Sequence, residues 1–254
     1  MRFDKVIPSD RLKPYIKYMV ISEHDSEKIY KVFPSAGLVL GFQYKGKLAA
    51  LNNGEENKLS AAGITGIADS FKIFKNSAGI GTVLIYFTEI GFAHFSSCPA
   101  NELFNLSISL DNLFAKQNVI EVGERLTAAL TDAERIKIVG AFLISQLKEK
   151  ESDKLIIQAV NLIYAAKGGI RIKELLTQLH ISQSAFEKRF RKLVGASPKK
   201  FSSIVRFNTV LQVLGQEKSL TEICYDNNFF DQAHFIKDFR QYTGDSPDTF
   251  RRFL

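Results

Sequence analysis

The sequence has little cysteine and no long hydrophobic run, and both absences narrow what the protein can be. The two cysteines among its 254 residues, Cys98 and Cys224, lie far apart in the chain and make neither a disulfide framework nor a metal cluster. No stretch approaches the roughly 18 apolar residues of a membrane span, and residues 1–8 carry no apolar leader. We therefore expect a soluble protein of the reducing cytoplasm, without a membrane partner.

Histidine is also scarce, which argues against a catalytic metal. In the first half of the chain, His24 and His94 lie far apart and no ligand pattern surrounds either of them. The sequence lacks a glycine-rich phosphate loop, and Gly79-Ile80-Gly81 is typical of a turn at the start of a strand. We expect no metal, no cofactor and no enzymatic activity.

What the chain does have is a globular composition and an uneven charge. With 45% hydrophobic residues it should fold, and its length predicts two domains, 1–150 and 151–254. The first range carries 18 basic and 16 acidic residues, net +2, and the second carries 16 and 11, net +5. Residues 167–206 alone carry ten basic and two acidic residues, net +8. This concentration of positive charge creates an electrostatic field that attracts a polyanion, most commonly nucleic acid.

The two parts also differ in periodicity. Up to about residue 89, apolar runs such as 37–42 and 82–87 alternate with turn sequences at 34–37, 52–54 and 76–79, which predicts an antiparallel sheet or small barrel. From Ile90 to Lys150 the spacing is helical, with a helix over 132–147. The charged stretch 148–154 is the expected junction, with Ser152 or Asp153 capping the next helix. The expected fold class is therefore α+β, with a β-rich N-terminal domain and an all-α C-terminal domain.

The C-terminal domain contains a repeat. Residues 186–201 and 235–250 are identical at eight of sixteen positions, namely the two Phe of each helix and the Lys, Arg, Gly, Ser, Pro and final Phe. Phe at i and i+4 form an apolar stripe on a helix. Gly195 and Gly244 end these helices, and Ser197-Pro198 and Ser246-Pro247 begin the next ones. The repeat therefore predicts, in both copies, a helix that ends at a glycine and a second helix that begins at the following Ser-Pro pair.

Each repeat is preceded by a second shared pattern, which makes it a helix-turn-helix unit. Residues 173–182 correspond to 221–230, and the recognition helices are expected to begin at Ser182 and near Asp231. Asn228 stands where the turn needs a left-handed residue. A helix over 198–214, about 25 Å long, joins the units. They could therefore place helices in successive major grooves, which recur every 34 to 36 Å.

These residues resemble the DNA-binding region of the AraC/XylS family of transcription regulators. The resemblance covers 155–254 and is most specific in 229–235, in Phe239-Arg240 and in Gly244 with Ser246-Pro247. It implies seven helices, two helix-turn-helix units and binding to promoter DNA. The chain departs from the family at Leu176, His180, Cys224 and Asn228, which affects packing and turns rather than DNA contacts.

Side chains opposite the Phe stripes are the candidate DNA contacts. The expected base contacts are Gln183, Ser184, Glu187, Lys188, Gln232, Ala233 and Lys237, of which the positions matching Ser184, Glu187 and Lys188 contact bases in the family. Lys188 could donate to guanine, and Glu187 could accept from cytosine or pair with Arg191. The expected phosphate contacts are Arg191, Lys192, Lys199, Lys200, Arg206 and Arg240.

The first 150 residues carry no comparable signature, and alternatives stay open for the whole chain. By resemblance, this part is an effector-sensing or dimerising domain of loosely cupin-like form, so a small-molecule effector and a second copy of the chain are candidate partners. Helix 132–147 could pair subunits or cover the sheet. The alternatives to a regulator are a DNA-repair methyl acceptor using Cys98 and a helical module that binds an acidic protein.

Overall fold

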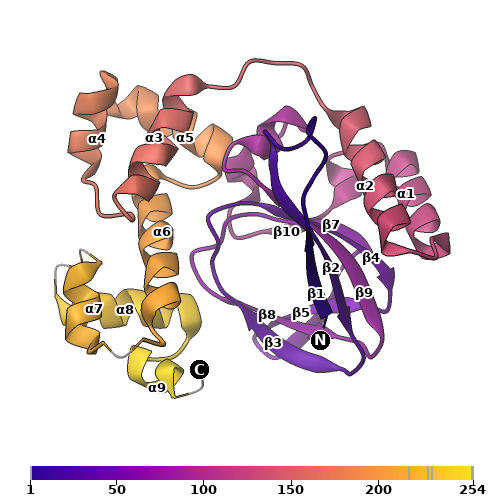
Figure 1. Cartoon of the computed structure of the whole chain (residues 1–254), viewed down its shortest axis with the longest axis horizontal. Coiled ribbons are helices and arrows are strands. Elements are labelled where there is room, and N and C mark those ends of the chain that lie inside the picture. The colour runs from indigo at the N-terminus through magenta and orange to yellow at the C-terminus, as the bar shows by residue number, and fades with distance from the viewer. Residues whose placement is uncertain (1, 217, 228, 230, 253–254) are drawn as a thin grey trace.

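The N-terminal part is built from two antiparallel sheets. The computed structural model describes residues 2–216, 218–227, 229 and 231–252. One sheet has six strands in the order β1-β2-β9-β4-β7-β10, and the other has four in the order β3-β8-β5-β6, so neither closes into a barrel (Figure 1). The strands are β1 (Arg2–Val6), β2 (Ile16–His24), β3 (Lys28–Val32), β4 (Val39–Lys45), β5 (Leu48–Asn52), β6 (Glu55–Lys58), β7 (Ala62–Thr65), β8 (Lys72–Asn76), β9 (Ile80–Phe87) and β10 (Ser107–Ser109).

The expected turns connect these strands. Asn53 and Gly54, at φ 51° and 85°, join β5 to β6, and Gly79, at φ 67°, joins β8 to β9. Asn and Gly occupy the left-handed region at little cost, which is why these positions turn the chain.

Two helices cover one face of the six-stranded sheet. They are α1 (Lys116–Ala128) and α2 (Asp132–Gln146), which lie beside β4 and β9 in Figure 1. The Thr131 hydroxyl accepts a hydrogen bond from the Glu134 amide and caps α2. Phe142 packs edge-on against Phe42 of β4, with ring centroids 5.7 Å apart. The apolar face of α2 therefore covers the sheet.

The expectation of helical spacing throughout 90–150 is wrong for residues 90–115. Residues before α1 form 3-10 turns at Gly91–His94, Ala100–Leu103 and Leu110–Asn112, and the short strand β10. Ile108 pairs with Ile64 of β7, so this segment extends the sheet. The helical spacing of apolar residues holds only from Lys116 onward.

The C-terminal part is helical throughout the described residues. Its helices are α3 (Lys154–Ala165), α4 (Ile172–Leu179), α5 (Gln183–Val194), α6 (Pro198–Val213), α7 (Leu220–Asp226), α8 (Gln232–Thr243) and α9 (Pro247–Arg251). Gly195 and Gly244 end α5 and α8 at φ 100° and 81°. The Ser197 hydroxyl caps α6 by accepting from the Lys200 amide, and Pro198 occupies the first turn. The predicted stop and restart is thus present in both repeats.

A segment without regular structure, 147–153, connects α2 to α3, and the predicted boundary at 150 falls within it. It arches over the top of the molecule in Figure 1, so that the helical part lies to the left of the sheets. Asp153 caps α3 by accepting from the Ile156 amide.

Candidate nucleic-acid interface

The first helix-turn-helix unit consists of α4 and α5. His180 ends α4 in the left-handed conformation, at φ 49°, which is where the family usually has glycine. Phe186 and Phe190 of α5 are fully buried, and Phe190 packs against Phe201 of α6 at 5.5 Å between ring centroids. The Phe stripe is therefore core, and the opposite face of α5 is turned to solvent.

That outward face carries the predicted base contacts of the first unit. Gln183, Ser184 and Lys188 are exposed, and Glu187 is half-buried. The Gln183 amide donates to the Glu187 carboxylate at 3.1 Å, and Arg191 lies 3.8 Å from the same carboxylate. No described acidic group pairs with Lys188. The face thus presents one paired acid and one exposed lysine.

The second unit consists of α7 and α8. A capping box begins α7, since Ser219 and Glu222 each bind the other's backbone amide. The Asp231 carboxylate accepts from the His234 amide at 2.7 Å and caps α8. Phe235 and Phe239 are buried like their counterparts in α5. The left-handed residue predicted at position 228 lies outside the described residues.

The predicted base contacts of the second unit, Gln232, Ala233 and Lys237, are all exposed on α8. His234 is exposed beside them, with its Nε2 3.4 Å from the Asp238 carboxylate. The outward face of α8 therefore has an amide, a methyl group and one lysine where α5 has an amide, a hydroxyl and one lysine.

The predicted phosphate contacts fall into two groups. Arg191, Lys192, Lys199 and Arg240 are exposed. Lys200 is half-buried and lies 3.7 Å from Asp69 of the N-terminal domain. The Arg206 guanidinium lies 4.7 Å from the centroid of the Phe229 ring, and burial lowers the pKa of this group. We expect Arg206 to contribute more to packing between α6 and the second unit than to phosphate binding.

Helix α6 joins the two units into one body. Phe201, near its start, packs on Phe190 of the first unit, and Phe207 packs on Phe239 of the second unit at 5.7 Å. The Arg251 side chain donates to the Leu214 carbonyl at 2.8 Å and ties α9 to the end of α6. The units lie at the two ends of α6, on the same side of the N-terminal domain (Figure 1). A helix of 16 residues sets them roughly 24 Å apart along its axis.

The N-terminal domain contacts both units near the C-terminal ends of their recognition helices, which the sequence did not indicate. The Lys31 ammonium donates to the Thr243 carbonyl at 3.0 Å and to the Asp245 carboxylate at 2.8 Å. The Gln241 amide donates to the Asp69 carbonyl at 3.0 Å. In the first unit, a Cβ added at Gly195 would lie 3.2 Å from the Ala100 carbonyl oxygen. These contacts leave the outward faces of α5 and α8 uncovered.

The cysteines and histidines form no reactive centre within the described residues. Burial and the nearby Glu102 carboxylate raise the pKa of the Cys98 thiol, whose Sγ lies 3.6 Å from the Pro99 carbonyl. Cys224 is buried in the core of the second unit, as expected. No group of three metal-ligating side chains occurs among the residues that the structure describes. Among the residues that the structure describes, no helix is both long and apolar enough to cross a membrane.

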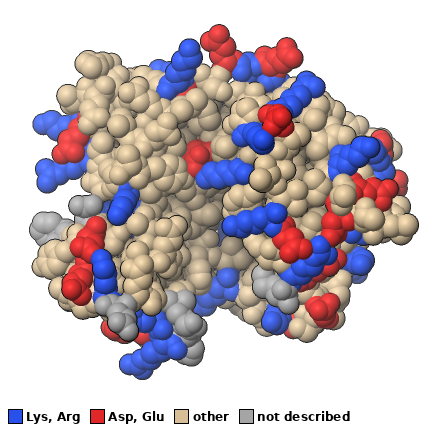
Figure 2. Space-filling model, in the orientation of Figure 1, with Lys and Arg blue, Asp and Glu red and all other residues tan. Residues whose placement is uncertain are grey.

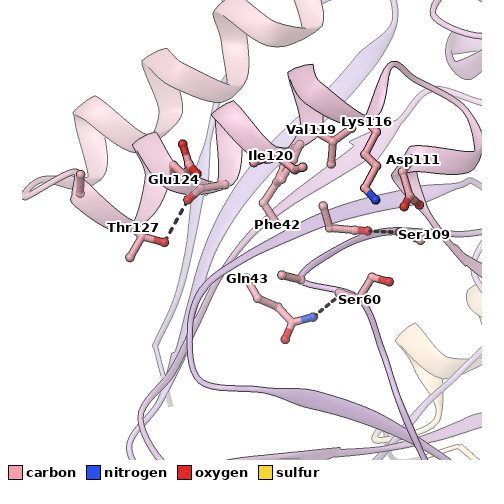
Figure 3. Close-up of a pocket in the computed structure, with 14 residues that line it drawn as sticks. Phe42, Gln43, Ser60, Ser109, Asp111, Lys116, Val119, Ile120, Glu124 and Thr127 are labelled. Atoms are coloured by element: carbon pink, nitrogen blue, oxygen red, sulfur yellow. Dashed lines mark hydrogen bonds between the residues drawn. The ribbon is translucent and has the colours of Figure 1, made fainter.

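A groove of about 740 Å³ lies between α1 and the six-stranded sheet (Figure 3). Phe42 and Val119 lie on its apolar side. Two of its uncharged polar side chains bond within the protein, since Gln43 donates to the Ser60 carbonyl at 2.8 Å and Thr127 to the Gly123 carbonyl at 2.9 Å. The groove therefore offers apolar contact more than directed hydrogen bonds.

Comparisons with known proteins agree with this geometry. Residues 175–252 match the family described as "Helix-turn-helix domain", and residues 4–109 match a domain of unknown function, DUF6597. The Msm operon regulatory protein of Streptococcus mutans is 29% identical over 143 residues, which are 55% of this chain and 51% of that protein. The chain thus spans about half the length of this curated relative.

Several solved structures are similar to this chain. The 1.65 Å structure of ToxT from Vibrio cholerae has a TM-score of 0.48 at 10% identity and covers 100% of this chain and 99% of its own. The C-terminal domain of AraT, a response regulator from Geobacillus stearothermophilus, has a TM-score of 0.39 at 18% identity and covers 41% of this chain and 89% of its own. Residues 175–252, which match the helix-turn-helix family, run from within α4 past the end of α9. The C-terminal part of the chain is thus an AraC-type helix-turn-helix domain, and the curated relative that it resembles is an operon regulatory protein.

Proposed function

We propose that the protein regulates transcription by binding promoter DNA with both helix-turn-helix units at once. The observation that carries this proposal is that one rigid helix, α6, holds two units whose outward faces are exposed and basic. Basic side chains project from the edge of the helical lobe in Figure 2. Because α6 holds the two recognition helices at a fixed separation, they can enter two adjacent segments of the major groove on one side of a duplex.

The candidate DNA contacts divide into side chains that contact bases and side chains that contact phosphates. Lys188 and Lys237 are the strongest candidates for base contacts, because an exposed ammonium can donate to guanine O6 or N7. Gln183, Ser184, Gln232 and Ala233 supplement them, and Glu187 accepts from cytosine when Arg191 turns toward a phosphate. Lys192, Lys199 and Arg240 contact phosphates and set the register on the duplex without reading sequence.

The test is selection of bound sequences from a random duplex pool by the full chain. Two enriched half-sites about 10 base pairs apart support the proposal, because that is the repeat of the major groove along one side of DNA. Binding should weaken steeply with salt, since cations replace condensed counterions. The matched control is Lys58→Ala, which removes an exposed lysine of β6 and should select the same sites. A pool that shows no enrichment contradicts the proposal.

We further propose that the N-terminal domain senses a small molecule and pairs two copies of the chain. This domain contacts both units directly, through Lys31, Asp69 and Ala100. A conformational change on effector binding would therefore alter the position of the recognition helices. The measurement is the molecular mass in solution by sedimentation equilibrium at micromolar concentration. A monomer under those conditions removes the dimer from this proposal and leaves DNA binding untouched.

The alternatives are less well supported. A methyl acceptor attacks with its thiolate, and the surroundings of Cys98 raise its pKa and so disfavour that form. Unchanged mass of Cys98 after exposure to alkylated DNA would remove this role. A module that binds an acidic protein would need the same basic face, so competition by duplex DNA separates the two functions.

A further inference from the structure

Segment 147–153, the linker between the two domains, is fixed to the N-terminal domain at one buried histidine. His94, at the end of the first 3-10 turn, is 2% exposed. The Ser152 hydroxyl lies 3.0 Å from its Nε2, and its backbone carbonyl accepts from the Lys148 amide at 2.8 Å. The Lys148 ammonium also donates to the Ser97 hydroxyl at 3.1 Å. The start and the end of the linker are therefore bound to the same short stretch of the N-terminal domain.

This stretch is a firm base, because its apolar side chains lie in the core of the N-terminal domain. Phe92 and Phe95 flank His94 in the sequence and are buried, and their rings pack on Phe87 of β9 at 5.8 and 5.5 Å between centroids. The Tyr15 ring packs on the imidazole, with ring centroids 4.5 Å apart. Close packing holds the imidazole in one place, so the linker is the part of this contact that can move away.

The linker passes this contact on to the first recognition helix. Asp153, next to Ser152, caps α3 by accepting from the Ile156 amide. The Asp153 carboxylate also accepts from Arg189 of α5, from Nε at 3.0 Å and from Nη2 at 2.7 Å. Arg189 follows Lys188, the candidate base contact, and α3 and α5 lie side by side at the end of the linker (Figure 1). The contacts of the linker therefore tie α5 to the imidazole.

No acidic group balances a positive charge on this imidazole. On the side of the N-terminal domain, the ring is covered by Tyr15. On the side of the linker, Lys148 contributes its backbone amide, and Lys150 repels a positive charge on the ring. Burial and this repulsion lower the pKa of His94 from its ordinary value. Within the described residues, the remaining charged side chains of the linker and of the next 3-10 turn make no bond to the ring, namely Glu102, Glu149, Glu151 and Asp153.

Only one nitrogen of the imidazole has a hydrogen-bond partner. Nε2 lies against the Ser152 hydroxyl, which can donate or accept. Nδ1 is buried and has no partner in the part of the protein that the structure describes. An imidazolium carries a proton on both nitrogens, so the proton on Nδ1 would be buried without an acceptor. The protonated ring therefore favours a state in which the linker has moved away and water reaches the ring.

We propose that the neutral imidazole of His94 holds the linker, and through it α5, against the N-terminal domain, and that mild acid releases this attachment. A ring that resists protonation while attached stabilises the attachment above the ordinary histidine pKa of about 6.5, and that stability is lost as the pH falls below this value. The second unit is attached separately, through Lys31 and Asp69. The proposal rests on the proposed function and adds a pH-dependent coupling between the N-terminal domain and the first recognition helix.

The test is hydrogen exchange of the full chain between pH 7.5 and 5.0, read by mass spectrometry on peptides that contain the linker and corrected for the intrinsic rate. In the unaltered protein, exchange of the linker amides should rise at least tenfold over this range. His94→Gln should remove most of the rise, because a neutral amide can bond to Ser152 and takes up no proton. His24→Gln is the matched control and should leave the rise unchanged, since His24 lies at the opposite end of β2 from Tyr15.

Ser152→Ala tests the same bond from the side of the linker and leaves the buried core unaltered. It should raise exchange of the linker amides severalfold at pH 7.5. It should also bring the midpoint of the His94 proton resonance in a magnetic resonance titration closer to the ordinary histidine value, because the ring is then less covered. Ser145→Ala, which removes an exposed hydroxyl of α2, is the control and should change neither quantity.

Three results would overturn the proposal: linker exchange that is the same at pH 7.5 and 5.0, a rise that persists in His94→Gln, or full protection in Ser152→Ala at pH 7.5. The same preparations are then titrated with a selected duplex. DNA binding should persist in every variant, because α6 joins the two units without the linker. A linker that does not respond to pH beside intact DNA binding refutes only this inference, whereas failure of the unaltered protein to bind DNA at pH 7.5 refutes the proposed function.

Discussion

The two helix-turn-helix units share a core and differ on their surfaces. Helix α5 carries four basic residues and one acidic, net +3, whereas α8 carries two basic and one acidic, net +1. Side chains cap both helices of the second unit, and in the first unit neither α4 nor α5 has a side-chain cap. The buried Phe pairs and the glycine stops are the same. Packing therefore constrains the interior of a repeat, and its outward face is free to diverge for a different stretch of DNA.

The largest effect should come from the shared core. Phe190→Ala and Phe239→Ala should each lower the free energy of unfolding by about 3 to 5 kcal/mol, because each removes a fully buried ring that packs on α6. Denaturant unfolding followed by circular dichroism measures the loss. Phe3→Ala, which truncates a ring that is 41% exposed, is the control and should cost much less. A loss confined to one unit would show that the repeats are not equivalent in packing.

The base contacts come next in magnitude. Lys188→Ala and Lys237→Ala should each cost roughly 1 to 3 kcal/mol of binding to the selected site and relax base preference in different half-sites. Lys58→Ala serves again as the surface control. Competition binding against duplexes altered at single positions gives both quantities. If either variant weakened binding equally for all duplexes, that lysine would be a phosphate contact.

The difference in charge between the units should appear in the salt dependence. Arg191→Ala should weaken binding to all sequences alike and lower the slope of log K against log salt by about one, because one cation fewer displaces counterions. Arg240→Ala should do the same for the second unit. Titrations from 50 to 200 mM salt give the slopes. An unchanged slope in Arg191→Ala would mean that its ion pair with Glu187, at 3.8 Å, persists on DNA.

Local signals explain why the helical half was predictable. Caps, stops and the Phe stripes depend on residues within four positions of one another, so the repeat showed them directly, and the structure has Ser197, Gly195 and Gly244 in those roles. Strand β10 was missed because it has three residues and depends on pairing with β7, more than 40 positions earlier. The assignment of base contacts among the exposed side chains stays a prediction, because only bound DNA determines which of these side chains reach a base and which reach a phosphate.

The contacts between the two domains could not be predicted from the sequence, because they too join residues that are far apart in the chain. Lys31 and Asp245 are 214 positions apart, and each looks like an ordinary surface charge in its own segment. Such pairs become visible only once the sheets and the helices are placed together.

The smallest effect should come from the contact that distinguishes the second unit, the Lys31–Asp245 ion pair. Both side chains are more than one third exposed, so solvent screens the pair, and its coupling should be about 0.2 to 1 kcal/mol. A double-mutant cycle of Lys31→Met and Asp245→Asn, read by thermal unfolding at low and high salt, isolates that coupling. Lys75→Met, which removes an ion pair within the second sheet, is the control and should show no coupling to Asp245→Asn. Coupling that survives 1 M salt would contradict a screened pair. A cost of Lys31→Met that persists in the Asp245→Asn background would indicate that the Lys31 bond to the Thr243 carbonyl also holds the second unit to the sheets.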